Sequence, residues 1–168
     1  MVRAFPAVPG YYGGIVALLD VTRSDDRHTA GRLAGEPVIW LGTVRPDGRP
    51  HNVPVWFAWH DPLVLIFSMP RTVKVRNARM SPAVSLALDS ADGGRDVVVA
   101  EGRATVVSRA DEHPHFLAAK FREKYSLSLG STSFEDWRVT FSQPLLVHVQ
   151  HITAWTRTDA GVAYRVVP

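Results

Sequence analysis

The hydrophobic pattern of the chain is mainly that of β-strands. Asp47-Gly48 separates two apolar runs and predicts a tight hairpin, because glycine adopts positive φ at little cost. Turns at residues 60–62 and 91–94 separate later runs in the same way. The runs are rich in Val, Ile and Trp, which half-buried pleated surfaces favour. They occupy residues 37–44, 49–59, 63–69, 83–89, 96–108, 145–156 and 161–167.

Two segments outside these runs carry helix signals. Ser24 is a candidate N-cap for a helix over residues 25–34, which has acidic residues in its first turn. A later helix fits residues 112–125, and Asp111 is its candidate cap. The stretch 127–133 is loop-like.

About six antiparallel strands, one central helix and a late helix predict a mainly β (α+β) fold, a small barrel with a few peripheral helices. Residues 1–23 look like an irregular N-terminal extension, and residues 24–168 form a single domain. The run VVVAEGRATVV, residues 97–107, is apolar on both faces. One face therefore lines the barrel interior, and the other needs a helix or a second subunit. We expect a homodimer.

The composition narrows the possible classes of function. The chain has 168 residues and no cysteine, so disulfides, thiolate catalysis and cysteine-based metal centres are excluded. A net charge of +3 is too small to argue for nucleic acid, and aromatic residues are not interleaved with basic clusters. No apolar run approaches the roughly 18 residues of a membrane span, and the apolar stretch 15–19 is shorter than a secretory core. We expect a cytoplasmic protein without nucleic-acid or membrane partners.

The histidines and glycines do not form a known catalytic motif. Two pairs of histidines lie close together in the sequence: His113 with His115, and His148 with His151. Neither pair has an acidic residue at the spacing of a metal ligand, so we expect no metal site. His148 and His151 are three residues apart on a predicted strand, which places them on opposite faces. The chain also lacks the G-x-S-x-G elbow of serine hydrolases, the G-x-G-x-x-G fingerprint and a Walker loop.

A short basic helix between Pro70 and Pro82 is the first candidate site. Pro70 suits the first helical position, and Pro82 blocks any continuation. Arg71, Lys74 and Asn77 recur at a spacing of three residues, which puts them on one helical face.

Cations at the beginning of this helix are repelled by the helix dipole, by about 0.3–1 kcal/mol each. Two interpretations stay open. The basic residues form a solvated surface, or they bind an anion such as phosphate, with Ser68 and Thr72 as hydroxyl donors beside them.

The strand NVPVWF holds the second candidate site. Pro54 cannot donate to a sheet ladder, so it marks an edge strand, a bulge or backbone that faces a ligand. Trp56 is either a core residue or a flat wall for an aromatic ring. Alternation places Asn52, Pro54 and Trp56 on one face of NVPVWF and His51, Val53, Val55 and Phe57 on the other.

Glu101 and Arg103 share one face of another predicted strand. We expect them to pair across strands, and we assign them no catalysis.

The order of these segments resembles the pyridoxamine 5′-phosphate oxidase-like split β-barrel superfamily. The resemblance covers residues 25–108 well, from LGTVRPDGRPHNVPVWFAWHDPLVLIFSMPRTVKVRNARMSPAVSLAL to VVVAEGRATVV. Within it, TVKVRN, with Thr72, Lys74 and Asn77, resembles the branch of flavin/deazaflavin oxidoreductases that use coenzyme F420. The resemblance implies a split-barrel homodimer with the cofactor at the subunit interface, its phosphate at the basic helix and its tricyclic ring against the strand that contains Pro54.

The same resemblance implies roles for individual residues. Lys74 and Asn77 would bind the phosphate or the chain attached to it, supported by Thr72 and Ser68, and Arg71 is an additional candidate ligand of the phosphate. We assign no catalytic acid or base. The ring would lie against His51, Asn52, Val53, Pro54, Val55 and Trp56.

The implied function is F420-dependent transfer of a hydride between the reduced cofactor and a conjugated, small-molecule organic acceptor. Two alternatives stay open. The first is an FMN-dependent oxidoreductase or flavin reductase on the same fold. The second is a non-catalytic protein that binds a cofactor or a tetrapyrrole.

Overall fold

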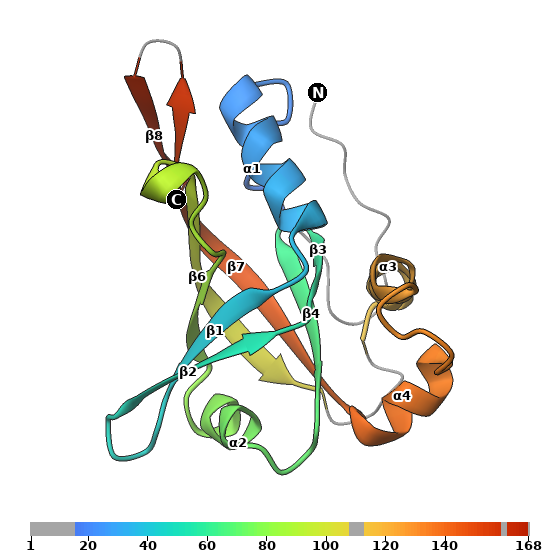
Figure 1. The fold of residues 1–168 in the computed structure, drawn as a ribbon. Coiled ribbons are helices and arrows are strands. Elements are labelled where there is room, and N and C mark those ends of the chain that lie inside the picture. The colour runs from blue at the N-terminus through green and yellow to red at the C-terminus, as the bar shows by residue number, and fades with distance from the viewer. Residues whose placement is uncertain (1–15, 108–112, 159–160, 168) are drawn as a thin grey trace.

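The computed structural model describes residues 16–107, 113–158 and 161–167. Within these residues, eight strands form one sheet and four α-helices lie around it (Figure 1). In chain order the elements are α1 (Ser24–Gly35), β1 (Ile39–Val44), β2 (Pro50–Val55), β3 (Ala58–His60), β4 (Leu63–Ser68), α2 (Val73–Met80), β5 (Ala83–Ala87), the 3₁₀ turn η1 (Asp92–Gly94), β6 (Val97–Val106), α3 (His115–Tyr125), α4 (Phe134–Thr140), β7 (Gln143–Thr158) and β8 (Gly161–Val167).

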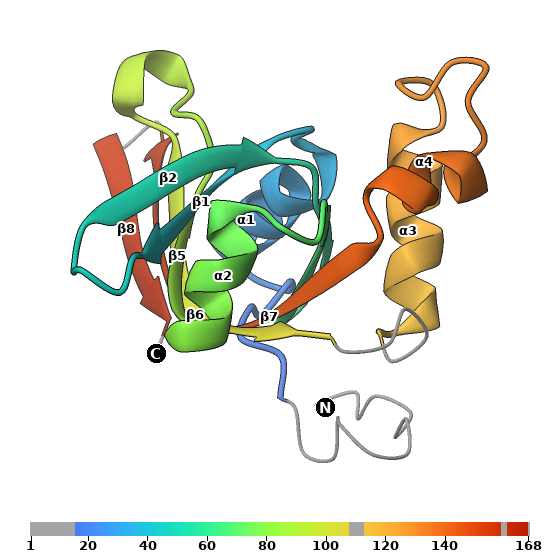
Figure 2. The same cartoon turned by 90° about the horizontal axis from the view of Figure 1, so that it is seen from below.

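The sheet curls into a half-barrel, and the first and last strands of its main order are neighbours in the sequence. All of its strand pairs are antiparallel, in the order β2-β1-β5-β6-β7-β4-β3, with β8 paired to β7. β2 and β3 therefore lie at opposite edges of the sheet, although only Trp56 and Phe57 separate them. Figure 2 shows the curl of the sheet, with α2 across its open end. The predicted mainly β split barrel with peripheral helices is confirmed.

The run 49–59 forms two strands, not the single strand expected, because the chain passes from one edge of the sheet to the other at Trp56 and Phe57. Pro54 lies on β2, which pairs only with β1. A proline without an N–H is accommodated at such an edge, because it removes no ladder hydrogen bond from a central strand. Gly48 turns the β1–β2 hairpin at φ 83°, as the Asp-Gly signal predicts.

The interior of the half-barrel is one apolar core. On β6, Val98, Ala100 and Ala104 face this core, whereas the intervening Glu101 and Arg103 are exposed. A second apolar cluster joins β3 and β4 to α3. All six residues of β4 are buried, because one of its faces lines the barrel and α3 covers the other.

Three helices begin earlier or later than the sequence signals indicate. Ser24 is the first residue of α1 and does not cap it; Arg23 occupies the N-cap position and makes no side-chain cap hydrogen bond. α2 begins at Val73 after Thr72 at its N-cap, so Pro70 lies in the preceding turn and not at the first helical position. The late helix α3 begins at His115, with Pro114 at its N-cap, and not at residue 112. Asp111, which lies outside the described residues, is therefore not its cap.

The sequence prediction omitted helix α4. Ser133 is its N-cap, and the Ser133 hydroxyl oxygen accepts a hydrogen bond from the Asp136 N–H at 3.0 Å. The spacing of a serine and an acidic residue three positions later was available in the sequence as a capping signal. The loop expected over residues 127–133 precedes it. Residues 16–23 form no helix or strand, and no helix in the described part of the chain is long and apolar enough to cross a membrane.

A β-bulge changes the expected placement of two histidines. Glu101 pairs with His151 but the next residue of β6, Gly102, pairs with Val149, so Gln150 is an extra residue in β7. The extra residue reverses the alternation, and both His148 and His151 are exposed. The expectation of opposite faces was therefore wrong.

Candidate functional site

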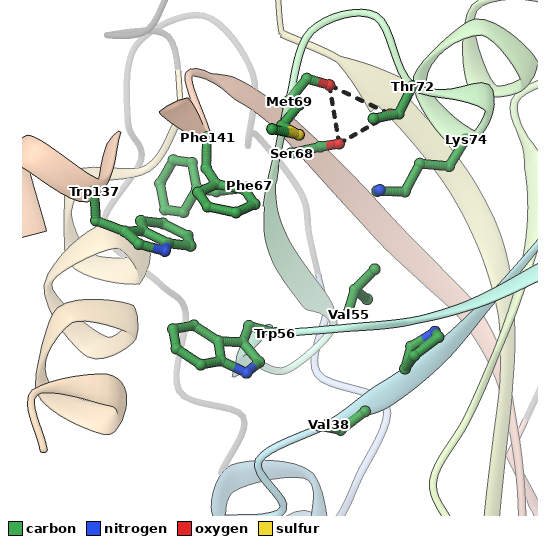
Figure 3. A pocket seen from close by; sticks show the side chains of 11 residues that line it. Val38, Val55, Trp56, Phe67, Ser68, Met69, Thr72, Lys74, Trp137 and Phe141 are labelled. Atoms are coloured by element: carbon green, nitrogen blue, oxygen red, sulfur yellow. Dashed lines mark hydrogen bonds between the residues drawn. The ribbon is translucent and has the colours of Figure 1, made fainter. Parts of the chain in front are cut away.

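A cavity of about 430 Å³ opens where the break between β2 and β3 meets the start of α2 (Figure 3). One end carries hydroxyl groups and an ammonium group, and the other end is aromatic. No acidic residue lines it. The lining residues are Val38, Pro54, Val55, Trp56, Phe67, Ser68, Met69, Thr72, Lys74, Trp137 and Phe141.

The polar end lies between the end of β4 and the first turn of α2. The hydroxyl oxygens of Ser68 and Thr72 are 3.0 Å apart, and each lies within 3.3 Å of the carbonyl oxygen of Met69. Thr72 is the N-cap of α2, yet its side chain does not accept a hydrogen bond from the helix. Within the described part of the chain, the first N–H groups of α2 thus receive no side-chain cap, which leaves them available to an anion.

Lys74 brings a positive charge to this end of the cavity. Its side chain is half-buried and points into the cavity (Figure 3), and burial lowers the pKa of its ammonium group. Among the described residues Lys74 makes no ion pair. A partly buried ammonium without a counter-ion favours a bound anion, because an anion recovers part of the lost hydration energy.

The positive potential extends to the β1–β2 hairpin. The pKa of His51 is lowered by burial and further by the positive charges of Arg45 and Lys74. The Arg45 Nε and the His51 Nδ1 are buried without a hydrogen-bond partner. The charge of Lys74 therefore reaches the β1–β2 hairpin, although neither Arg45 nor His51 lines the cavity.

Stacked rings build the aromatic end. The Trp56 ring stacks with Tyr125 of α3, at 4.4 Å between ring centroids and 4° between planes, and with Trp137 of α4, at 5.7 Å and 20°. Phe141 also stacks with Trp137, at 4.4 Å. The Trp56 ring is therefore held from α3, and the facing wall of the cavity comes from α4. Trp56 is both part of the packing and a wall of the cavity.

Tyr125 also holds the backbone at the break between the two edge strands. Its hydroxyl oxygen accepts a hydrogen bond from the Phe57 N–H at 2.9 Å, and it lies 2.8 Å from the Pro37 carbonyl and 3.0 Å from the Phe57 carbonyl. Burial raises the pKa of this phenol to about 12, so it stays a donor at neutral pH. One buried side chain thus fixes the Trp56 ring and the chain next to it.

The structure brings together six of the eleven residues expected at the site. Pro54, Val55 and Trp56 come from the end of β2, and Ser68, Thr72 and Lys74 come from the other side of the cavity. The five remaining residues do not line it: His51 and Asn52 line a hollow on the outer face of the sheet, Val53 packs against the core, Arg71 is exposed in the turn before α2, and Asn77 is buried.

Asn77 departs most from its expected role as a phosphate ligand. It is 0% exposed, and its Nδ2 donates a hydrogen bond to the Thr43 hydroxyl at 3.0 Å. Thr43 in turn donates to the His51 carbonyl at 3.3 Å. In this structure Asn77 connects α2 to the β1–β2 hairpin and offers no surface to a ligand. Spacing by three residues placed it near Lys74 but did not show that this side of the helix is covered by β1.

Sequence reasoning missed five of the lining residues, among them Val38, Phe67 and Met69. The other two are Trp137 and Phe141. They are four residues apart, which places them on one face of a helix. That aromatic pair, following the Ser133 capping signal, was the available clue. Its position over Trp56 is a contact between segments about 80 residues apart in the sequence, and no local pattern indicates such a contact.

The hollow on the outer face is a separate feature, of about 640 Å³, and strands alone line it. Glu101 and Arg103 are exposed there, and neither forms the cross-strand ion pair that we expected. Their cross-strand neighbours explain this: Ser85 and His151 flank Glu101, and Ala83 and His148 flank Arg103. Among the described residues, no three His, Asp or Glu side chains are grouped in a way that holds a metal ion.

The pyridoxamine 5′-phosphate oxidase family matches residues 26–148 of the chain. This match covers well over half of the sequence, and the chain therefore belongs to that family. No curated protein matches it by sequence.

Solved structures repeat the fold at low sequence identity. A conserved hypothetical protein, Rv2991 from Mycobacterium tuberculosis, superposes with a TM-score of 0.60 at 21% identity, over 80% of this chain and 88% of the other. An F420 reductase gives 0.55 at 22% identity, over 71% and 92%. An FAD-binding protein from Mesorhizobium loti gives 0.56 at 23% identity, over 75% and 88%. Likeness at this identity shows the split-barrel fold alone.

Proposed function

We propose that this protein is an F420-dependent oxidoreductase that transfers a hydride between the reduced cofactor and a conjugated organic acceptor. The observation that carries the proposal is the two-ended cavity. Lys74, without a counter-ion, stands at one end, and stacked aromatic rings stand at the other. A ligand with a phosphate and a flat ring system matches both ends. The F420 reductase among the structural neighbours supports the choice of cofactor.

In this proposal the chain binds and orients the cofactor. Lys74 and the free N–H groups of the first turn of α2 hold the phosphate, with the hydroxyls of Ser68 and Thr72 beside them and Arg71 at the rim. The edge of β2 from Pro54 to Trp56 lies against the ring, since an edge strand keeps unpaired backbone groups on its outer side. When bound, the deazaflavin supplies the hydride chemistry, and the protein supplies position and charge.

Three of the expected ligands take indirect or interfacial roles. Asn77 positions the β1–β2 hairpin through Thr43 and does not touch the phosphate. His51 and Asn52 line the outer hollow, so they reach a cofactor only if the site continues across that face. We propose a homodimer in which the cofactor site lies at the subunit interface, because His51 and Asn52 would then lie beside the cofactor. Val53 supports β2 from the core side.

A binding titration tests the proposal. The purified chain, freed of ligands, is titrated with oxidised F420 and separately with FMN, followed by fluorescence polarisation. We expect F420 to bind at least about tenfold more tightly than FMN. Lys74→Ala should weaken F420 binding by roughly 10- to 100-fold, because it removes a charge-assisted hydrogen bond worth about 1.5–3 kcal/mol. Arg76→Ala is the matched control, because Arg76 is an exposed cation on the same helix that does not line the cavity.

The outcomes separate the alternatives. Tighter binding of FMN would replace F420 by a flavin on the same phosphate site, a possibility that the FAD-binding neighbour keeps open. Tight cofactor binding without turnover of any quinone, enone or nitro acceptor would indicate a non-catalytic carrier, and binding of a tetrapyrrole instead would identify its cargo. If Lys74→Ala binds as tightly as the parent, the assignment of the phosphate end is wrong.

A further inference from the structure

The outer face of the sheet carries two opposite charges without partners. Glu101 and Arg103 stand on the same face of β6, both exposed, with Gly102 between them. Neither forms an ion pair with any described residue, and their cross-strand neighbours include no other acid, lysine or arginine. The charges lie beside the hollow of about 640 Å³ that β1, β2, β5, β6 and β7 form together.

The other residues that line the hollow include no acid, lysine or arginine. They combine small residues, Gly42, Ala83 and Ser85, with neutral polar or ring side chains such as Trp40, Asn52 and Gln150. No residue of a described helix lines the hollow. A sheet face of this kind, with small residues and a single charge of each sign, is suited to close contact with a second surface.

We propose that a second copy of this chain packs its own outer face on this one, about a twofold axis at Gly102, so that Glu101 of each subunit pairs with Arg103 of the partner subunit. This inference rests on the homodimer of the proposed function and specifies its contact. A twofold axis that crosses β6 at Gly102 sets the two copies of β6 antiparallel. Position 101 of one copy then lies opposite position 103 of the other, and the contact occurs twice.

The reciprocal pairing gives these charges the partner that they lack within one chain. Charges that are removed from water at an interface stabilise the contact only if they are paired. If the two copies of β6 ran parallel, Glu101 would face Glu101 of the partner subunit and Arg103 would face Arg103 of the partner subunit. Repulsion between these like charges disfavours the parallel arrangement. The same hollow includes His51 and Asn52, so this dimer places the partner against two of the expected cofactor contacts that do not line the cavity.

Charge reversal tests the pairing. Sedimentation equilibrium on the ligand-free protein gives the dimer dissociation constant of the parent, Glu101→Arg, Arg103→Glu and the double variant. Each single reversal creates two like-charge contacts, because the symmetry repeats it. We expect each to weaken the dimer by at least about tenfold, and the double variant to return to within about threefold of the parent.

The matched control uses a charge pair far from this face. Arg122 of α3 and Glu135 of α4 are 3.9 Å apart and 61% and 73% exposed. Glu135→Arg also reverses an exposed acid, and it should leave the dimer unchanged. Glu101→Gln and Arg103→Gln provide milder variants in case a reversal prevents folding, and circular dichroism melts report folding for all of them.

Three results would overturn the inference. The parent protein could be monomeric at about 100 µM, a concentration well above the micromolar range of ordinary dimers. The single reversal variants could dimerise as tightly as the parent, or the double variant could dimerise as weakly as the single variants.

The dimer dissociation constant is measured without cofactor, so this test is independent of the proposed function. A dimer that follows the reversal pattern but binds neither F420 nor FMN would refute the proposed function alone. Tight F420 binding with a dimer insensitive to both reversals would refute only this pairing.

Discussion

Lys124, near the end of α3, should destabilise the folded protein at neutral pH. Its side chain is half-buried, and its Nζ is buried without a hydrogen-bond partner. The ammonium lies 3.8 Å from the centroid of the Phe57 ring. Burial lowers the pKa of Lys124 from 10.5 to about 8, although the charge of Glu36 acts in the opposite direction. The folded state therefore disfavours the charged form of this lysine.

The size of the effect follows from that pKa. The fall from 10.5 to about 8 corresponds to about 3.4 kcal/mol, at about 1.36 kcal/mol per pKa unit. Solvent still reaches part of the side chain, and screening reduces the cost to about half. The contact of the ammonium with the Phe57 ring returns about 0.5–1 kcal/mol. Lys124→Met keeps the length of the side chain without the charge, so it should stabilise the protein by about 1 kcal/mol at pH 7.

The gain should depend on pH with a defined sign. Below pH 8 the lysine is charged in both the folded and the unfolded state, and the full cost is present. Between pH 8 and 10.5 the folded state loses the proton while the unfolded state keeps it, so the parent recovers stability and the advantage of Lys124→Met shrinks. Tyr125, whose pKa is about 12, does not titrate in this window.

Thermal and urea unfolding from pH 7 to pH 10 measure this difference. We expect Lys124→Met to raise Tm by about 2–4 °C at pH 7 and by much less at pH 10. Lys120→Met is the control, because Lys120 is an exposed residue of the same helix, and it should show no such gain. A Lys124→Met protein that is less stable than the parent at pH 7, or a gain that does not change with pH, would refute the reasoning.

Three other predictions concern the site and the bulge. Tyr125→Phe deprives the buried Phe57 N–H of its acceptor and should lower the free energy of unfolding in urea by about 1–3 kcal/mol; an unchanged midpoint would contradict this role. Gly102→Ala sets a Cβ against the His148 carbonyl oxygen and should cost about 2 kcal/mol or more in the same assay, whereas Gly31→Ala, in open space on α1, should not destabilise. Trp137→Leu removes a stacking wall of the cavity and should weaken binding of the ring-bearing cofactor by roughly three- to tenfold in the polarisation titration, while Val139→Ala, exposed on the same helix, should leave it unchanged.

The sequence by itself determined most of the strands and the β1–β2 hairpin, and it restricted Pro54 to an edge strand, a bulge or backbone that faces a ligand. These features are local: alternation reflects which face of a strand is buried, Gly48 supplies the positive φ of the turn, and a proline without an N–H cannot occupy a central strand. Ser68, Thr72 and Lys74 were also identified together, because one short segment holds all three and the structure keeps them within one cavity.

The tertiary structure alone decided how these local features meet. Trp56 faces Trp137 across about 80 residues of sequence, and Asn77 is covered by Thr43 of β1. The extra residue in β7 that moves His151 to the face of His148 depends on how β6 packs against β7 at Gly102. In each case the position of a side chain is set by a contact between distant segments, and periodicity within one segment carries no information about that contact.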